Sequence, residues 1–205
     1  MDLLHVSSEE ISIVDGVNQH FKDIHHNPEV HNITYENSQA RERTQILMDL
    51  SNAYNAIVVG TGDLSELALG WCTYNGDHMS MYAVNASVPK TLVRYIVESV
   101  ALKDEILHDV LMDICDTPVS PELLPPDKNG KIAQKTEEVL GSYDLHDFFL
   151  YQMLRHHDEP KKIYDLACVA FKDVEKETIK KAITTFYNRF FTQQFKRNCM
   201  PDGVK

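Results

Sequence analysis

Apolar residues recur at helical spacing through much of the chain, and the pattern predicts a predominantly helical protein. Helices are expected at residues 15–24, 38–55, 89–102, 104–115, 143–156, 160–172 and 174–195, with a short one beginning near residue 63. Pro89 suits the first position of its helix, because a proline nitrogen carries no N–H group that would need a partner there.

Two segments are predicted as strands. Residues 10–14 alternate between polar and apolar side chains, and residues 56–59 form an apolar run that stops at Gly60, as in a buried parallel strand. Residues 25–37, 70–89 and the proline-rich segment 117–130 are predicted loops. Two strands cannot make a sheet that buries itself. The chain is therefore either nearly all-α or the later part of an α/β domain.

Composition restricts the class of protein. The 205 residues suit one domain, and 31 acidic against 20 basic residues give a net charge of −11. This charge disfavours a nucleic-acid surface but permits a small anionic ligand in a locally basic pocket. No run is long and apolar enough to span a membrane, and the N-terminus does not resemble a signal peptide. We therefore expect a cytoplasmic protein whose widely spaced cysteines are free thiols.

The most promising ligand site lies at residues 58–66, where the second predicted strand runs through two glycines into a helix. Ligands of open α/β sheets bind at such strand ends, and the exposed N–H groups of a helix N-terminus favour an anion. Thr61 could donate to a phosphate, and Glu66 could hold Mg²⁺. The spacing of Asp63 and Glu66 is equally that of a helix capping box, which needs no ligand. The dinucleotide-binding and P-loop glycine patterns are both absent.

Several cations lie where a helix is predicted to begin. Arg41 and Arg43 follow the start near residue 38, and Lys90 directly follows Pro89. The positive end of the helix dipole disfavours cations there, so a bound anion would explain them. Alternatively they lie on a solvated surface, where each costs only about 0.3–1 kcal/mol. Lys196 and Arg197 give no such indication, because cations are stabilised at the end of a helix.

Six longer segments carry a resemblance to a known family: residues 35–45, 60–79, 85–94, 120–125, 145–150 and 189–197. They resemble the synthetase domain of glutamine-dependent NAD⁺ synthetases, which belong to the ATP-pyrophosphatase superfamily. The resemblance covers nearly the whole chain. It implies an α/β fold, the later part of a parallel-sheet, Rossmann-like domain of the adenine-nucleotide-hydrolase type.

The resemblance also implies an activity. Enzymes of this family use ATP and Mg²⁺ to adenylate the nicotinate carboxylate of deamido-NAD, which releases pyrophosphate. Ammonia, supplied from glutamine in the full-length family, then displaces AMP and gives NAD. Adenylation is needed because a carboxylate is a poor acyl donor until its oxygen belongs to a good leaving group, and such an enzyme aligns the reactants and neutralises phosphate charge.

Roles for individual residues follow from the resemblance by matching motifs. The implied ATP-binding residues are Thr61, Lys90 and Ser120. The implied deamido-NAD-binding residues are Asn37, Arg41, Trp71, Asp77, Phe195 and Lys196. Glu66 would bind Mg²⁺, and Lys90 and Lys196 would act in catalysis. Because deamido-NAD binds at a dimer interface in this family, we expect a homodimer or larger homo-oligomer, without a nucleic-acid or membrane partner.

The sequence also departs from the family. The Ser-Gly-Gly-x-Asp-Ser loop that cradles pyrophosphate is missing, since no two glycines are adjacent, and no amidase domain is present. Residues 1–205 are therefore interpreted as a partial synthetase domain without its first strands, inactive alone. Two other hypotheses are a non-catalytic dimerisation or assembly fragment of the same enzyme and, if the strand at 56–59 is wrong, an all-α interaction protein.

Overall fold

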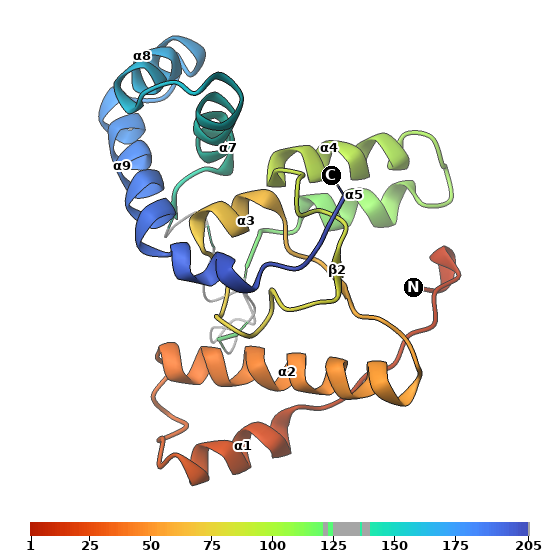
Figure 1. Ribbon diagram of the computed structural model, residues 1–205. Coiled ribbons are helices and arrows are strands. Elements are labelled where there is room, and N and C mark those ends of the chain that lie inside the picture. Colours follow the sequence, from red (N-terminus) through yellow and green to blue (C-terminus); the bar gives the residue numbers. More distant parts are fainter. Residues whose placement is uncertain (121–122, 125–135, 137–139, 205) are drawn as a thin grey trace.

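The computed structural model describes residues 1–120, 123–124, 136 and 140–204, most of them in helices. Figure 1 shows α1 (Val14–Asp23) lying along α2 (Ile33–Ala53), with α3 (Leu64–Leu69) at the centre of the molecule. A hairpin follows, formed by α4 (Lys90–Ala101) and α5 (His108–Asp116). Most of the predicted proline-rich loop lies outside the described residues.

The last third of the chain is a helical bundle. It contains α7 (Tyr143–Tyr151), the π-helical turn η2 (Gln152–His156), α8 (Pro160–Ala170), α9 (Lys176–Thr192) and the 3₁₀ turn η3 (Gln194–Cys199). Another 3₁₀ turn, η1 (Asp2–Leu4), stands at the N-terminus. Along the described part of the chain, no helix combines the length and apolar character that crossing a bilayer would require.

A short parallel sheet joins the middle of the chain. β1 (Val59–Gly60) pairs with β2 (Tyr82–Ala83), with Val59 opposite Tyr82 and Gly60 opposite Ala83. Ala83 also forms an isolated parallel bridge with Gly203. The all-α alternative is therefore wrong. The strand is shorter than residues 56–59 predicted, and Val59 is 52% exposed rather than buried.

The hydrophobic core fixes α3 against the C-terminal bundle. Leu69 of α3, Phe149 of α7, Ile163 of α8, and Ile179 and Phe186 of α9 are all fully buried. Phe149 and Phe186 meet edge to face, with ring centroids 5.8 Å apart. α3 packs against α9, and the turn η3, which follows α9, also contacts α3 (Figure 1).

Two expectations for the N-terminal part are wrong. Residues 10–13 form no strand, and Val14 already belongs to α1. α2 begins at Ile33, inside the predicted loop, because the Asn32 side chain caps it by accepting the N–H groups of Thr34 and Tyr35 at 3.0 and 3.2 Å.

The early start of α2 removes one argument for an anion site. Arg41 and Arg43 lie in the third turn of the helix rather than the first. The dipole penalty falls off within the first turn, so neither arginine is disfavoured where it stands.

Candidate functional site

A cavity of about 590 Å³ lies among α2, α3, the segment after α3 and the turn η3 that follows α9. It gathers most of the residues that the sequence assigned to ligands. Eight of the ten line it: Asn37, Thr61, Glu66, Trp71, Asp77, Ser120, Phe195 and Lys196. The other two lie outside the lining. Arg41 is exposed and donates its Nε–H to the Tyr74 carbonyl at 3.3 Å, and Lys90 contacts the cavity through Glu66.

A capping box forms the N-terminal end of α3. Asp63 Oδ1 accepts the Glu66 N–H at 2.9 Å, and Glu66 Oε2 accepts the Asp63 N–H at 3.2 Å. The capping interpretation of this motif is therefore confirmed. It leaves the second oxygen of each carboxylate available for a cation.

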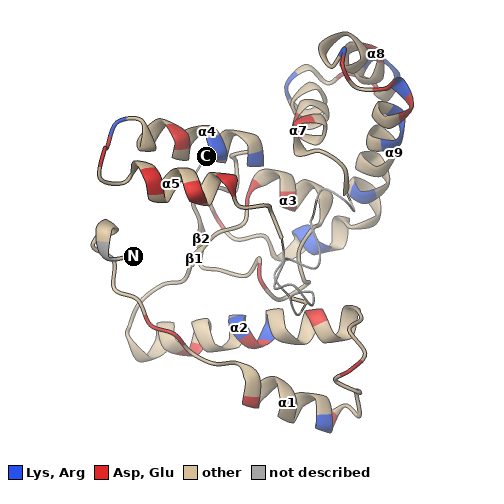
Figure 2. Cartoon of the chain, turned by 180° about the vertical axis from the view of Figure 1, so that it is seen from behind, with Lys and Arg blue, Asp and Glu red and all other residues tan. Residues whose placement is uncertain are grey.

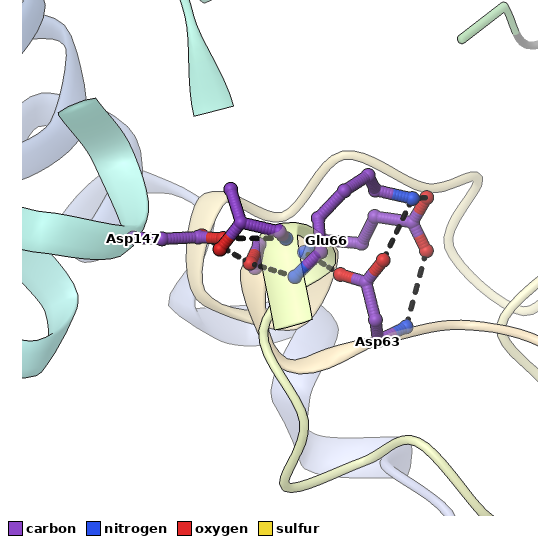
Figure 3. Close-up of polar contacts among 6 residues, drawn as sticks. Asp63, Glu66 and Asp147 are labelled. Carbon is purple, nitrogen blue, oxygen red and sulfur yellow. Dashed lines mark hydrogen bonds and ion pairs between the residues drawn. The ribbon is translucent and has the colours of Figure 1, made fainter. Parts of the chain in front are cut away.

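Lys90 supplies that cation (Figure 3). Its Nζ lies 2.6 Å from Asp63 Oδ2 and 2.8 Å from Glu66 Oε1. Pro89 is the N-cap residue of α4 rather than its first residue, so Lys90 stands at the positive end of the helix dipole. The anions that its position indicated are therefore two carboxylates of the chain itself.

These charges shift one another's protonation. Burial raises the pKa of Glu66, the neighbouring Asp63 charge raises it further, and Lys90 partly opposes both. Burial alone would lower the pKa of Lys90, but the Glu66 and Asp63 charges outweigh it and leave that pKa raised. The two carboxylates thus stabilise the charged ammonium of Lys90. Their attraction is stronger in this partly buried setting than it would be in water.

Asp147 of α7 is a further acid beside this cluster (Figure 3). It lies in the matching segment 145–150, but the resemblance implied no role for it. Its Oδ2 accepts the N–H and the hydroxyl of Thr91 at 2.9 and 2.7 Å, and its Oδ1 accepts the hydroxyl of Ser65. Burial raises the pKa of Asp147, against the effect of these hydrogen bonds. A contact between residues so far apart in sequence leaves no local signal.

Three cations converge on the opposite end of α3, and two of them, Arg189 and Lys196, line the cavity. Arg189 donates to the carbonyls of Leu69 and Gly70 at 2.9 and 3.3 Å, and Lys196 Nζ donates to those of Gly70 and Cys72 at 2.9 and 2.6 Å. The last carbonyls of a helix have no partner within it, so these side chains satisfy them. Figure 2 shows blue segments where the end of α9 approaches α3.

Neutral carbonyls do not cancel the charge of these cations. No ion pair in the described ranges includes Arg189 or Lys196, and both line the cavity. Burial lowers the pKa of each, which is the cost of holding a cation without a carboxylate partner. The Arg189 guanidinium also lies 5.1 Å from the centre of the Trp71 ring. Arg189 lies in the matching segment 189–197, but the resemblance implied no role for it.

Polar contacts shape the segment that follows α3. Asn37 Oδ1 accepts the Thr73 hydroxyl at 2.8 Å, and Asp77 Oδ1 accepts the Thr73 N–H at 2.6 Å. The rings of Tyr74 and Phe195 meet with centroids 5.4 Å apart. Asn37, Asp77 and Phe195 all line the cavity, and each also contacts Thr73 or Tyr74 in the segment after α3.

Glu66 stands without a ready set of metal ligands. Within the described residues, no three His, Cys, Asp or Glu side chains are grouped to hold a metal ion. Mg²⁺ in nucleotide enzymes uses one or two carboxylates together with substrate phosphates. Glu66 fits that incomplete set because it lines the cavity. Its oxygens already contact the Asp63 N–H and Lys90 Nζ, so Mg²⁺ would share Glu66 with these partners or displace them.

Comparison with known proteins identifies the family. A family model described as NAD synthase matches residues 1–199. The chain belongs to this family. The glutamine-dependent NAD(+) synthetase of Mycobacterium leprae is 39% identical over 98% of the chain, and the match covers 33% of the relative. The chain therefore spans about one third of the length of that curated relative.

Solved structures share the fold. A glutamine-dependent NAD(+) synthetase from Cytophaga hutchinsonii superposes with a TM-score of 0.67 at 19% identity, covering 92% of this chain and 29% of the other. The NMN synthetase of Francisella tularensis gives 0.65 at 20% identity, covering 94% of this chain and 66% of the other. The predicted α/β fold, mostly helical in this chain, is confirmed.

Proposed function

We propose that this chain is part of a synthetase domain that adenylates deamido-NAD with ATP and Mg²⁺ and then amidates it with ammonia, giving NAD, AMP and pyrophosphate. The observation that carries the proposal is the meeting of eight expected ligand residues, from separate segments, around one cavity. Membership of the NAD synthase family supports the same reaction.

Each end of α3 would serve a different part of the reaction. At the C-terminal end, Lys196 and Arg189 offer positive charge to an anionic group of deamido-NAD, and the Trp71 ring offers a flat apolar surface to its nicotinate ring. At the N-terminal end, Thr61 and Lys90 would meet the ATP phosphates, together with Ser120. Holding both reactants in one cavity replaces a collision between them by a local rearrangement.

Glu66 would hold Mg²⁺ together with phosphate oxygens. When bound, the ion neutralises charge that develops on the phosphates. Lys90 Nζ lies within reach of the same carboxylate, so it would orient Glu66 and share its charge.

We further propose that residues 1–205 form only part of the synthetase domain, and that ammonia comes from glutamine hydrolysed elsewhere in the whole protein. Exposed apolar side chains along the α4–α5 hairpin support this, because such a surface is normally covered. They are Leu92, Tyr95, Ile96, Val100, Leu102, Ile106, Val110 and Ile114. On this basis the chain alone is inactive. We propose a cytoplasmic homodimer, of which the dimer rests on the family resemblance.

Calorimetric titration of the chain with deamido-NAD tests the binding half of the proposal. We expect Lys196→Gln to weaken binding about ten-fold or more, equivalent to about 1.4 kcal/mol. The matched control is Lys181→Gln, which removes an exposed lysine from α9 and should change nothing. Circular dichroism verifies that each variant is folded.

A second candidate function, assembly without catalysis, is favoured by the same exposed hairpin surface. Two results would refute the proposed cavity function. In one, the folded parent chain binds no deamido-NAD. In the other, the Lys196→Gln variant binds deamido-NAD as tightly as the parent chain does. Assembly would then be the better explanation, and light scattering would reveal a defined oligomer.

A further inference from the structure

The N-terminus of α4 is capped by side chains of two other helices. Pro89 is its N-cap residue and offers no side-chain acceptor to the first N–H groups of the helix. Instead, Ser65 Oγ on α3 accepts the Lys90 N–H at 2.9 Å, and Asp147 Oδ2 on α7 accepts the Thr91 N–H at 2.9 Å. The first turn of α4 is thus tied to both neighbouring helices.

Asp147 holds both of these ties. Besides the Thr91 N–H, its Oδ2 accepts the Thr91 hydroxyl at 2.7 Å, and its Oδ1 accepts the Ser65 hydroxyl. The side chain is buried, with 8% of the residue exposed. A carboxylate at the positive end of a helix is favourable, and charge-assisted hydrogen bonds in a buried setting are strong. Asp147 therefore holds Thr91, the residue after Lys90, directly, and it holds the Lys90 backbone N–H through Ser65.

A second contact leads from α7 to the Lys90 side chain itself. Tyr143 lies one turn before Asp147, so both residues share a face of α7. The centre of its ring is 5.5 Å from Lys90 Nζ, within the range of a cation–π interaction. Helix α7 thus contacts Lys90 at its ammonium and, through Asp147 and Ser65, at its backbone.

We propose that Asp147 is a positioning residue for Lys90. By tying the first turn of α4 to α3 and α7, it holds the Lys90 ammonium between Asp63 and Glu66 beside the cavity. Its consequence for catalysis rests on the proposed function, in which Lys90 meets the ATP phosphates. The positioning itself is a property of the chain without a ligand.

Lysine acylation measures this positioning directly. The chain is treated with an amine-acetylating reagent, and the rate at each lysine is followed by mass spectrometry of peptides. In Asp147→Ala the first turn of α4 loses the acceptor of the Thr91 N–H, and the Lys90 ammonium is no longer held against Asp63 and Glu66. An amine released from two ion pairs is more accessible to the reagent than one that is held between them. We expect Lys90 to react several-fold faster, with a smaller increase in the conservative variant Asp147→Asn.

Lys196 is the internal reference, because its ammonium is held by the carbonyls of Gly70 and Cys72 and not by α4. Its rate should not change. Asp165→Ala, which removes an exposed acid from α8, is the control variant and should leave Lys90 as in the parent chain.

Two results would overturn the proposal. Equal acceleration at Lys90 and Lys196 would mean that Asp147 only stabilises the whole chain. An unchanged Lys90 rate in folded Asp147→Asn would mean the same, even where Asp147→Ala does not fold. No ligand is present in these measurements. A chain that fails to bind deamido-NAD would therefore refute the proposed function while leaving this outcome unaffected.

Discussion

Replacing Lys90 by methionine tests whether the cluster at the start of α3 is an energetically coupled unit. The substitution keeps an unbranched side chain that is only one atom shorter, and it removes the charge. It leaves two carboxylates facing each other, of which Asp63 has only 3% of its side chain exposed and Glu66 has 25%. Removing one partner of a buried ion pair costs roughly 3–5 kcal/mol. Because Lys90 is itself 22% exposed, we expect about 3 kcal/mol, the lower end of that range.

The loss should depend on pH. The pKa of Glu66 is already raised by burial and by Asp63, and removing Lys90 takes away the charge that lowers it. An acid whose folded pKa is raised adds stability below its unfolded pKa, and that stability is lost as the pH rises through the folded pKa. Each further unit by which the pKa of Glu66 rises is worth about 1.4 kcal/mol. The deficit of Lys90→Met should therefore be smallest near pH 4.5 and largest near neutral pH.

Urea unfolding of the parent chain and of the variant, at intervals across this pH range, gives the free energy of unfolding. Lys161→Met is the matched control, because Lys161 is 88% exposed and its pair with Asp165 lies on the surface. Such a pair contributes at most about 1 kcal/mol. The reasoning is refuted if Lys90→Met destabilises the chain no more than Lys161→Met, or if its deficit does not change with pH.

Two further predictions follow from the segment at the end of α3. Gly70→Ala should destabilise the chain by about 2 kcal/mol or more, from backbone strain and overpacking together. Gly70 has φ of +59°, and a Cβ there would overlap Gln193 Cβ. Gly141→Ala, at φ of +95° with its nearest neighbour 3.7 Å away, should show the strain alone in the same unfolding assay. Burial and the Asp77 charge raise the pKa of Cys72 from 9.0 to about 12, so its thiolate is about a thousand times scarcer at neutral pH. Iodoacetamide should therefore label Cys72 last in the folded chain and at an ordinary rate in urea, and fast labelling in the folded chain would contradict this.

Local patterns predicted most of the helices but fewer of their beginnings. Helical spacing of apolar residues predicted helices at 160–172 and 174–195, and α8 and α9 lie within those bounds. The prediction succeeds because these apolar residues, such as Ile163 and Phe186, face the core. The start of α2 was missed because it depends on one capping side chain, Asn32, in a segment that otherwise reads as polar loop. Residues 10–13 alternate as a strand would, yet no strand lies beside them to pair with in the described part of the chain.

The site divides in the same way. The capping box at Asp63 and Glu66 is a short-range pattern, and its spacing was visible in the sequence. The contacts of Asp147 with Ser65 and Thr91 join three helices, and no spacing along the chain encodes them. The family resemblance named most of the ligand residues that line the cavity, but it does not explain why they lie close together. The explanation is the packing of α3 on α7 and α9, which is set by buried apolar residues rather than by the polar ones.

The sequence analysis inferred from Lys90 both that an anion lies nearby and that this anion is a bound ligand. The structure supports the first inference without requiring the second. A cation at a helix N-terminus does need an anion nearby, and the structure supplies carboxylates at Asp63 and Glu66. It does not follow that a ligand provides the anion. Two acids, Asp63 and Glu66, flank one ammonium at this end of α3, whereas Arg189 and Lys196 at the other end form no ion pair in the described ranges. A bare phosphate is therefore favoured at the C-terminal end of α3. At the N-terminal end, a phosphate needs a companion cation to offset the acids, and this is the physical reason to expect Mg²⁺ beside Glu66.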